Sequence, residues 1–148
     1  MSGGPGGTLA PGDPLAGELR ALARRALGVE VEAIEPLSGG LGHRRFFRLR
    51  LAGPPGSCVA RVDRGTPAPG VPAEPPLEPT RAFLEAHGLP VPRRLGGDAS
   101  GLDLLEDAGS RALAALAPTL APDARRALYR EACALVPRLQ RLHDAEGR

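Results

Sequence analysis

Hydrophobic and polar positions along the chain predict a helix, then a group of strands, then further helices. In the segment 14–27, apolar residues fall on one face at helical spacing: Leu15, Leu19, Leu22 and Ala26. Asp13 offers a capping carboxylate, Pro14 suits the first helical position, and Gly28 can end the helix in a left-handed turn. We therefore expect a helix that covers a sheet.

Three strands are predicted next. Residues 29–37 alternate between apolar and acidic side chains, and 47–51 alternate between apolar residues and arginines. In the segment 57–63, period-two alternation puts Val59 and Arg61 on one face and Cys58, Ala60 and Val62 on the other. These strands are expected to pair antiparallel.

Prolines and glycines mark the later elements. Residues 64–76 are too rich in proline for a regular element, and Pro79 and Gly88 delimit a short helix over 79–87. Residues 89–95 read as extended chain, and 102–106 as one more strand. From Pro122 onward, a helix kinked at Pro137 carries leucines at helical spacing: Leu128, Leu135, Leu139 and Leu142.

Together these elements predict an α+β fold, with a small antiparallel sheet of about five strands, a helix packed on it and a C-terminal helical segment. Gly (20) and Pro (17) are concentrated in 1–14 and 53–79, so residues 1–13 are expected to be disordered. We divide the rest into a lobe over 14–108 and a helical segment over 109–148.

Composition limits the classes of function. All 19 basic residues are arginine, and the net charge of +2 is too small to indicate a nucleic acid or membrane partner by itself. No apolar run of 18 residues and no targeting signal is visible. Cys58 and Cys133 lie far apart and fit no metal spacing, which predicts reduced thiols and a cytoplasmic location.

The glycine-rich segment 38–42 is the first candidate site. Backbone N–H groups can hold a phosphate only where the chain is curved and lacks Cβ atoms, a condition that Gly39, Gly40 and Gly42 beside Ser38 would meet. An ordinary hairpin loop is the alternative. A dinucleotide fingerprint needs a helix after the glycines, and a Walker loop needs lysine, which the chain lacks. The protein-kinase order of strand, glycine loop, strand and cation-bearing strand remains.

Arg61 stands where that order requires the cation, although strand arginines more often face solvent. A helix-borne carboxylate is then expected to hold the cation, with Glu78 as first candidate and Glu74 behind it. Alternatively, Glu78 only favours the positive N-terminus of its helix.

Four stretches resemble, in order, landmarks of the aminoglycoside phosphotransferase family, and in particular its bacterial anomeric kinases for N-acetylmuramate and N-acetylglucosamine. They are LSGGLGHRRFFRL, AFLEAHGLPVPRRLGGD, LDLLEDAG and ALYREACALVPRLQ, within residues 15–142. The resemblance implies the N-terminal lobe of a kinase-like fold that binds ATP with Mg. Ser38, Gly39, Gly40 and Gly42 would cover the phosphates, Arg61 would replace the usual lysine, and the hinge backbone at Glu106, Asp107 and Ala108 would meet the adenine.

The chain also departs from this pattern. The sugar kinases typically carry Asp and Ser after the first glycine, where this chain has Gly40, Leu41 and Gly42. The family relies on a catalytic aspartate and on an asparagine and a second aspartate that hold the metal, all after the hinge. No asparagine is present, Asp123 reads as a helix N-terminal charge, and His143 with Asp144 reads as a helix C-terminus. We therefore expect no Mg ligands in this chain and an incomplete kinase that is inactive alone.

A kinase lobe separated from its other half predicts a separate C-terminal lobe as partner or self-association through the leucines of 128–142. A pseudokinase-like scaffold that binds nucleotide without turnover is a second possibility. A nucleic-acid-binding module built on HRRFFRLR is a third, less favoured because the aromatic residues are few and Phe47 should face the core.

Overall fold

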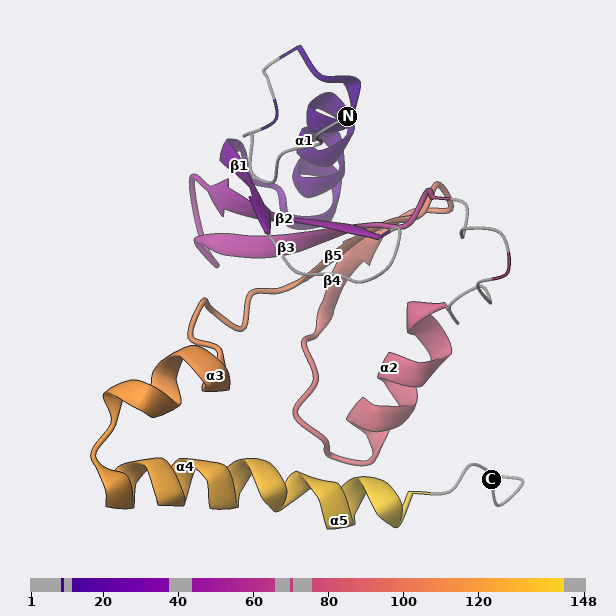
Figure 1. Ribbon diagram of the computed structural model, residues 1–148. Helices are drawn as coiled ribbons and strands as arrows, with labels where there is room; N and C mark the ends of the chain where they lie inside the picture. The colour runs from indigo at the N-terminus through magenta and orange to yellow at the C-terminus, as the bar shows by residue number, and fades with distance from the viewer. Residues whose placement is uncertain (1–8, 10–11, 38–43, 66–69, 71–75, 143–148) are drawn as a thin grey trace. The chain divides into compact units, whose positions relative to one another are not determined.

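The computed structural model describes residues 9, 12–37, 44–65, 70 and 76–142. Contacts divide the chain into two compact units: Met1–Glu74 with Pro92–Ala108, and Pro75–Val91 with Gly109–Arg148. In the described residues, the first unit holds a sheet and one helix, and the second holds short helices (Figure 1). Most of the segment expected to be disordered, 1–13, lies outside the described residues, as do Ser38, Gly39, Gly40 and Gly42.

Helix α1 (Pro14–Leu27) has the boundaries that its sequence predicts. The Asp13 side chain caps it by accepting from the N–H of Leu15 at 2.9 Å, and Gly28 ends it with φ of 70°. Three leucines at helical spacing, Leu15, Leu19 and Leu22, are buried. Ala26 is exposed but lies beside Gly96, at the edge of the buried face.

Five strands form one antiparallel sheet in the order β1-β2-β3-β5-β4. They are β1 (Val31–Leu37), β2 (Arg45–Leu51), β3 (Ser57–Val62), β4 (Arg94–Gly97) and β5 (Leu102–Glu106). β5 lies between β3 and β4, so the last hairpin joins the sheet through its second strand. The expected α+β class, with a five-stranded antiparallel sheet and several helices, is confirmed.

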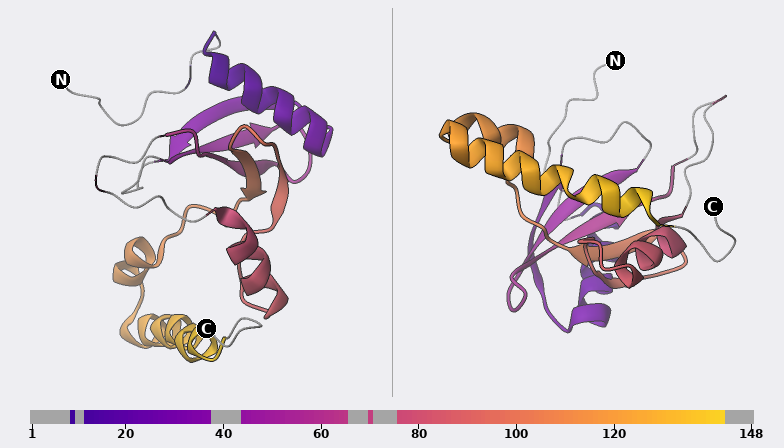
Figure 2. Two further views of the ribbon diagram at one scale, coloured as in Figure 1. Left: turned by 90° about the vertical axis from the view of Figure 1, so that its right-hand side faces the viewer. Right: turned by 90° about the horizontal axis from the view of Figure 1, so that it is seen from below.

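The core lies between α1 and one face of the sheet (Figure 2). Its strand residues share one face of the pleated sheet, two positions apart within β2, β3 and β5: Ile34, Phe47, Leu49, Cys58, Ala60, Val62, Leu102 and Leu104. The expected core position of Phe47 is confirmed by its 4% exposure. The intervening positions of β2, β3 and β5 point to the opposite face, and this face carries the polar residues analysed below.

The second unit contains α2 (Leu77–Ala86), α3 (Leu113–Leu116), a 3₁₀ turn (Ala117–Thr119), α4 (Pro122–Cys133) and α5 (Leu135–Gln140). Glu78 has an extended backbone, so the regular turns of α2 begin at Pro79, as expected. Arg138 of α5 donates to the carbonyl of Gly88 after α2 at 2.6 Å. This bond links the last helix of the unit to the first.

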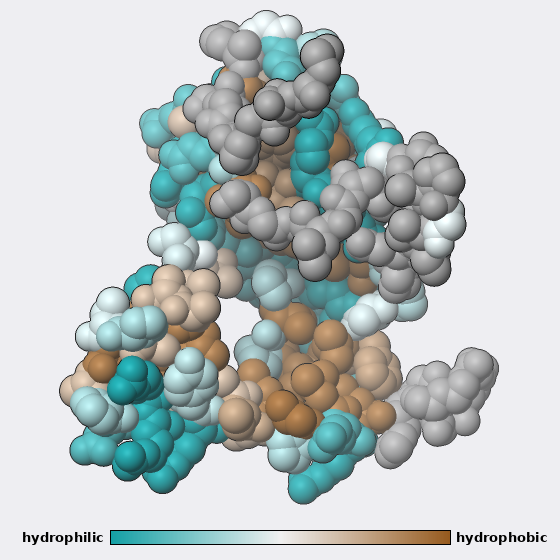
Figure 3. Space-filling view, viewed as in Figure 1, coloured by the Kyte–Doolittle hydropathy of each residue, from teal (hydrophilic) through white to brown (hydrophobic). Residues whose placement is uncertain are grey.

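The helix expected to kink at Pro137 is instead two helices, α4 and α5, separated at Ala134. Pro137 has no N–H to offer the carbonyl of Cys133, four residues earlier, which accounts for the interruption at that point. Apolar side chains of this unit reach the surface (Figure 3): Tyr129, Val136 and Leu139 are 45–49% exposed.

Candidate functional site

Arg61 lies near the end of β3 on the sheet face opposite α1. Strand alternation places it there, because Ala60 and Val62 on either side of it point into the core. Its cross-strand neighbours are Phe46 on β2 and Asp103 on β5. Although it is a cation, only 5% of it is exposed, so its charge requires close anionic partners.

Two carboxylates supply this compensation. Arg61 Nη1 donates to Asp103 Oδ2 at 2.8 Å, and Nη2 donates to Asp63 Oδ2. Asp103 is the direct cross-strand partner, whereas Asp63 follows the end of β3, two residues after Arg61 on the same face. A guanidinium group suits this place because it can donate in several directions in its own plane.

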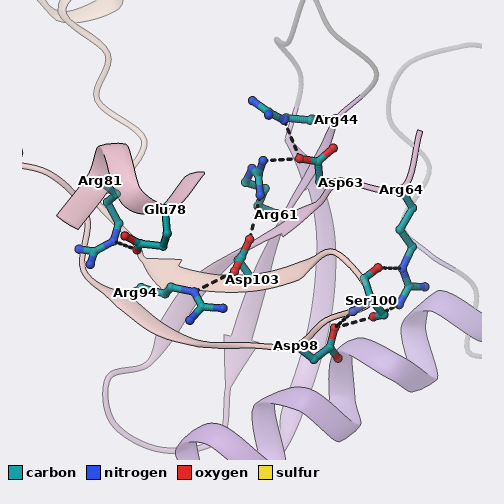
Figure 4. A network of polar contacts seen from close by, with 10 residues as sticks. All are labelled: Arg44, Arg61, Asp63, Arg64, Glu78, Arg81, Arg94, Asp98, Ser100 and Asp103. Carbon is teal, nitrogen blue, oxygen red and sulfur yellow. Dashed lines mark hydrogen bonds and ion pairs between the residues drawn. The ribbon is translucent and has the colours of Figure 1, made fainter. Parts of the chain in front are cut away.

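The contacts continue on both sides of Arg61 (Figure 4). Asp63 Oδ2 also accepts from Arg44 Nε at 3.0 Å, and Asp103 Oδ1 accepts from Arg94 Nε at 2.9 Å. We call Arg44, Asp63, Arg61, Asp103 and Arg94 the arginine-aspartate network. The network reaches from the residue before β2 to β4, across the end of the sheet where 38–43 joins β1 to β2.

A second cluster lies on the same face, at the opposite end of β3. Arg48 binds Asp107 through Nε at 2.7 Å and through Nη2 at 3.0 Å, and the Ser57 hydroxyl donates to Asp107 at 2.8 Å. Burial, followed by the nearby Asp107 carboxylate, raises the pKa of the Cys58 thiol to about 11. Cys58 is therefore a protonated core residue near neutral pH and a poor nucleophile.

Of the residues expected to form the hinge, Glu106 belongs to the sheet, and Asp107 and Ala108 follow the end of β5. Glu106 ends β5, and its N–H donates to the carbonyl of Arg93 at 2.8 Å. Hydrogen bonds from the Arg93 side chain and backbone hold the pKa of the Glu106 carboxyl below its usual range. The Asp107 side chain is bound by Arg48, and Ala108, the last residue of the first unit, is exposed.

Glu78, the expected partner of Arg61, belongs to the second unit. Its carboxylate binds Arg81 and accepts from the N–H of Ala82 at 3.1 Å, both within α2. Within the first unit, Arg61 forms ion pairs with Asp63 and Asp103. Glu74, Ser38, Gly39, Gly40, Gly42, His143 and Asp144 lie outside the described residues.

Sequence reasoning missed four members of the network: Arg44, Asp63, Arg94 and Asp103. Two signals could have found the aspartates. Asp103 interrupts an otherwise apolar strand, LDLLE, and a carboxylate in such a strand needs a cationic partner. Asp63 is two residues from Arg61, a spacing that places both on one strand face.

Comparison with known proteins gave no match: no family model, curated protein or solved structure is significantly similar to the chain. Among the described residues, no three His, Cys, Asp or Glu side chains gather as metal ligands would. No helix in the described ranges has both the length and the apolar character needed to cross a bilayer.

Proposed function

We propose that the chain is the nucleotide-binding lobe of a small-molecule phosphotransferase related to the aminoglycoside phosphotransferases, acting on a hydroxyl of a sugar or an aminoglycoside-like acceptor. In this proposal Arg61 binds the ATP phosphates, the glycine-rich turn 38–42 covers them, and the backbone at Glu106, Asp107 and Ala108 meets the adenine. Two free cysteines favour a reducing compartment, which we take to be the cytoplasm.

The observation that carries the proposal is the position of Arg61. It lies on the third strand, beside the antiparallel pair β1 and β2 between which the glycine-rich segment falls in the sequence, on the face opposite α1. Arg44, the first described residue after that segment, shares the Asp63 carboxylate with Arg61. Arg44 and the candidate cation therefore lie within reach of one small anion.

The chemistry of the network fits a polyphosphate. Guanidinium groups bind phosphate oxygens through paired N–H donors. This chain's residues would orient the phosphates and offset their charge, which are the main protein contributions to phosphoryl transfer. Bound Mg²⁺ would neutralise further phosphate charge, but its ligands do not belong to this network.

The acceptor site, the catalytic aspartate and the metal ligands belong, by the resemblance, to a C-terminal lobe. We propose that transfer requires such a lobe, as part of a separate partner or of a self-association. The 45–49% exposure of Tyr129, Val136 and Leu139 is compatible with an apolar contact at the helical unit. The Arg48 and Arg50 side chains bind carboxylates, which makes this strand less suited to a nucleic acid.

Thermal unfolding with and without Mg-ATP tests the proposal. A ligand at one hundred times its Kd stabilises a protein by about 2.7 kcal/mol, so the midpoint of the wild type should rise with nucleotide concentration. Arg61→Gln and Gly40→Val should lose this rise, and Arg61→Lys should keep part of it. Arg24→Gln is the matched control, because Arg24 belongs to an exposed pair with Glu30 at the end of α1. No rise in the wild type would contradict nucleotide binding by this chain.

A further inference from the structure

The arginine-aspartate network poses a physical problem for a phosphate ligand, because Arg61 is buried and already bound to two carboxylates. A ligand that only added to these contacts would bring further negative charge against Asp63 and Asp103. A ligand that replaced one of the carboxylates would keep the burial of Arg61 compensated. The two aspartates differ in how readily each could be replaced.

Asp103 is held in the sheet. It lies within the β3 and β5 pairing, directly across from Arg61, and its side chain is 12% exposed. Its two oxygens bind different cations, Oδ2 to Arg61 and Oδ1 to Arg94. Displacing Asp103 would therefore remove the carboxylate that links Arg61 on β3 to Arg94 on β4.

Asp63 is in a more accessible position. It follows the last residue of β3, its side chain is 23% exposed, and its N–H is bound to the carbonyl of Gly101 at 2.8 Å. A rotation of its side chain would leave that backbone bond intact. One oxygen, Oδ2, accepts from both Arg44 and Arg61. A single oxygen between two guanidinium groups has the coordination that a terminal phosphate oxygen would take.

We propose that Asp63 is an internal stand-in for the phosphate: a terminal oxyanion of the bound polyphosphate takes the place of the Asp63 carboxylate between Arg44 and Arg61. Asp103 stays in place and acts as a positioning residue for Arg61. The exchange replaces one anion with a more highly charged one, while the released carboxylate turns to solvent. This inference rests on the proposed function, since it names the residues that regulate the same site.

The test compares two variants that lose the same charge from the same network. Binding of inorganic tripolyphosphate, and separately of Mg-ATP, is measured by calorimetry on the full chain for the wild type, Asp63→Asn and Asp103→Asn. Removing the competing carboxylate should strengthen tripolyphosphate binding by about tenfold or more, since a hydrogen bond to a charged group is worth at least one factor of ten. Asp103→Asn should bind more weakly than the wild type, because Arg61 loses its fixed partner.

Two controls complete the experiment. Glu30→Gln removes one negative charge from the exposed pair with Arg24, before the start of β1 and away from the 38–43 segment, and should leave the Kd unchanged. Asp63→Ala removes the same competitor without an amide group and should reproduce the gain if Asp63→Asn fails to fold.

Each possible result of the binding measurements leads to one conclusion. Equal strengthening in Asp63→Asn and Asp103→Asn would mean that the network responds only to charge, and weaker binding in both Asp63 variants would make Asp63 a supporting ligand; either result overturns the inference. If the wild type binds in an Arg61-dependent way and the Asp63 variants bind equally well, the inference fails and the proposed function stands. If no variant binds tripolyphosphate or Mg-ATP, both fail.

Discussion

At the scale of single residues, Asp103 connects the arginines of the polar sheet face. It is one carboxylate among leucines of β5, and it holds Arg61 and Arg94 on the strands on either side. A carboxylate in such a place stabilises only through its partners, because burying it alone would be unfavourable. Asp103 and Arg61 therefore act as one unit.

A double-mutant cycle tests this coupling. Asp103→Leu alone should lower the free energy of unfolding by about 3 kcal/mol, because it leaves buried arginines with less compensation. The double variant Arg61→Leu with Asp103→Leu should lose less than the sum of the two single losses, with a coupling of about 1–3 kcal/mol. Urea unfolding provides the measurement, and strict additivity would contradict the coupling.

The buried thiol of Cys58 should make the stability of the chain depend on pH in the alkaline range. Its raised pKa, about 11, means that the unfolded chain ionises the thiol before the folded chain does. The contribution of the thiol to the free energy of unfolding is therefore fully present up to about pH 8.5, the usual pKa of a thiol. From there toward pH 11 the free energy of unfolding falls by at most about 1.4 kcal/mol per pH unit. The chain has no lysine, so few other groups titrate in this range.

Unfolding measured between pH 8 and pH 11 checks this expectation. Cys58→Ala should lose most of the decline, while Cys133→Ala, which changes an exposed thiol, should keep it. An identical decline in the wild type and in Cys58→Ala would show that the thiol is not its source.

At the scale of elements, the contact between α1 and β4 depends on a glycine. A Cβ built on Gly96 would lie 2.5 Å from the Cβ of Ala26. Two non-bonded carbon atoms cannot lie so close, so the backbone of the helix or the strand would have to move. Gly17, on the exposed side of α1, has nothing within 4 Å of the same position. One substitution should therefore have opposite effects at the two sites.

Gly96→Ala should destabilise the chain by about 1–3 kcal/mol through overpacking. Gly17→Ala should stabilise it by about 0.5–1 kcal/mol, because alanine has the better helix propensity and no clash arises. Combining Gly96→Ala with Ala26→Gly should recover part of the loss. Thermal or urea unfolding measures all three, and a neutral Gly96→Ala would contradict the close approach of helix and strand.

The elements also show what the sequence can and cannot predict. α1 was predictable because a cap, a proline, a 3.6-residue period and a closing glycine agree, and the face of Arg61 followed from alternation in β3. β4 was predicted only as extended chain, since its Gly96 and Gly97 carry no strand signal. The partners of Arg61 depend on β5 pairing with β3, and such long-range pairing leaves no local pattern. The phosphate roles of Ser38, Gly39, Gly40 and Gly42 stay predictions.

At the scale of the whole molecule, arginine–carboxylate pairs link many elements of the sheet unit. Hydrogen bonds from arginines hold the pKa values of Glu30, Glu35 and Glu106 below the usual range. A lowered carboxyl pKa means that the unfolded chain binds more protons as the pH falls. The stabilisation that these pairs contribute is then present above about pH 4.3, the usual pKa of glutamate, and is lost as the pH falls below it.

We expect the thermal midpoint to be nearly constant from pH 7 to pH 5 and to fall steeply below that range. Glu35→Gln removes one exposed pair, with Arg50, and should make the acid decline shallower. Concentrated NaCl should have a similar effect by screening the exposed pairs. A midpoint that rises on acidification would contradict this account of the charge pairs.

Nucleotide binding by this chain requires that Arg61 contacts a phosphate. The most direct measurement follows the side-chain Nε–H signals of the arginines by ¹H–¹⁵N NMR while Mg-ATP is added to the wild-type chain. We predict that the signals of Arg61 and Arg44 shift together and saturate with one Kd, while those of Arg24 and Arg50 stay in place. If the chain is saturated with nucleotide and the Arg61 signal does not shift, the central claim is contradicted.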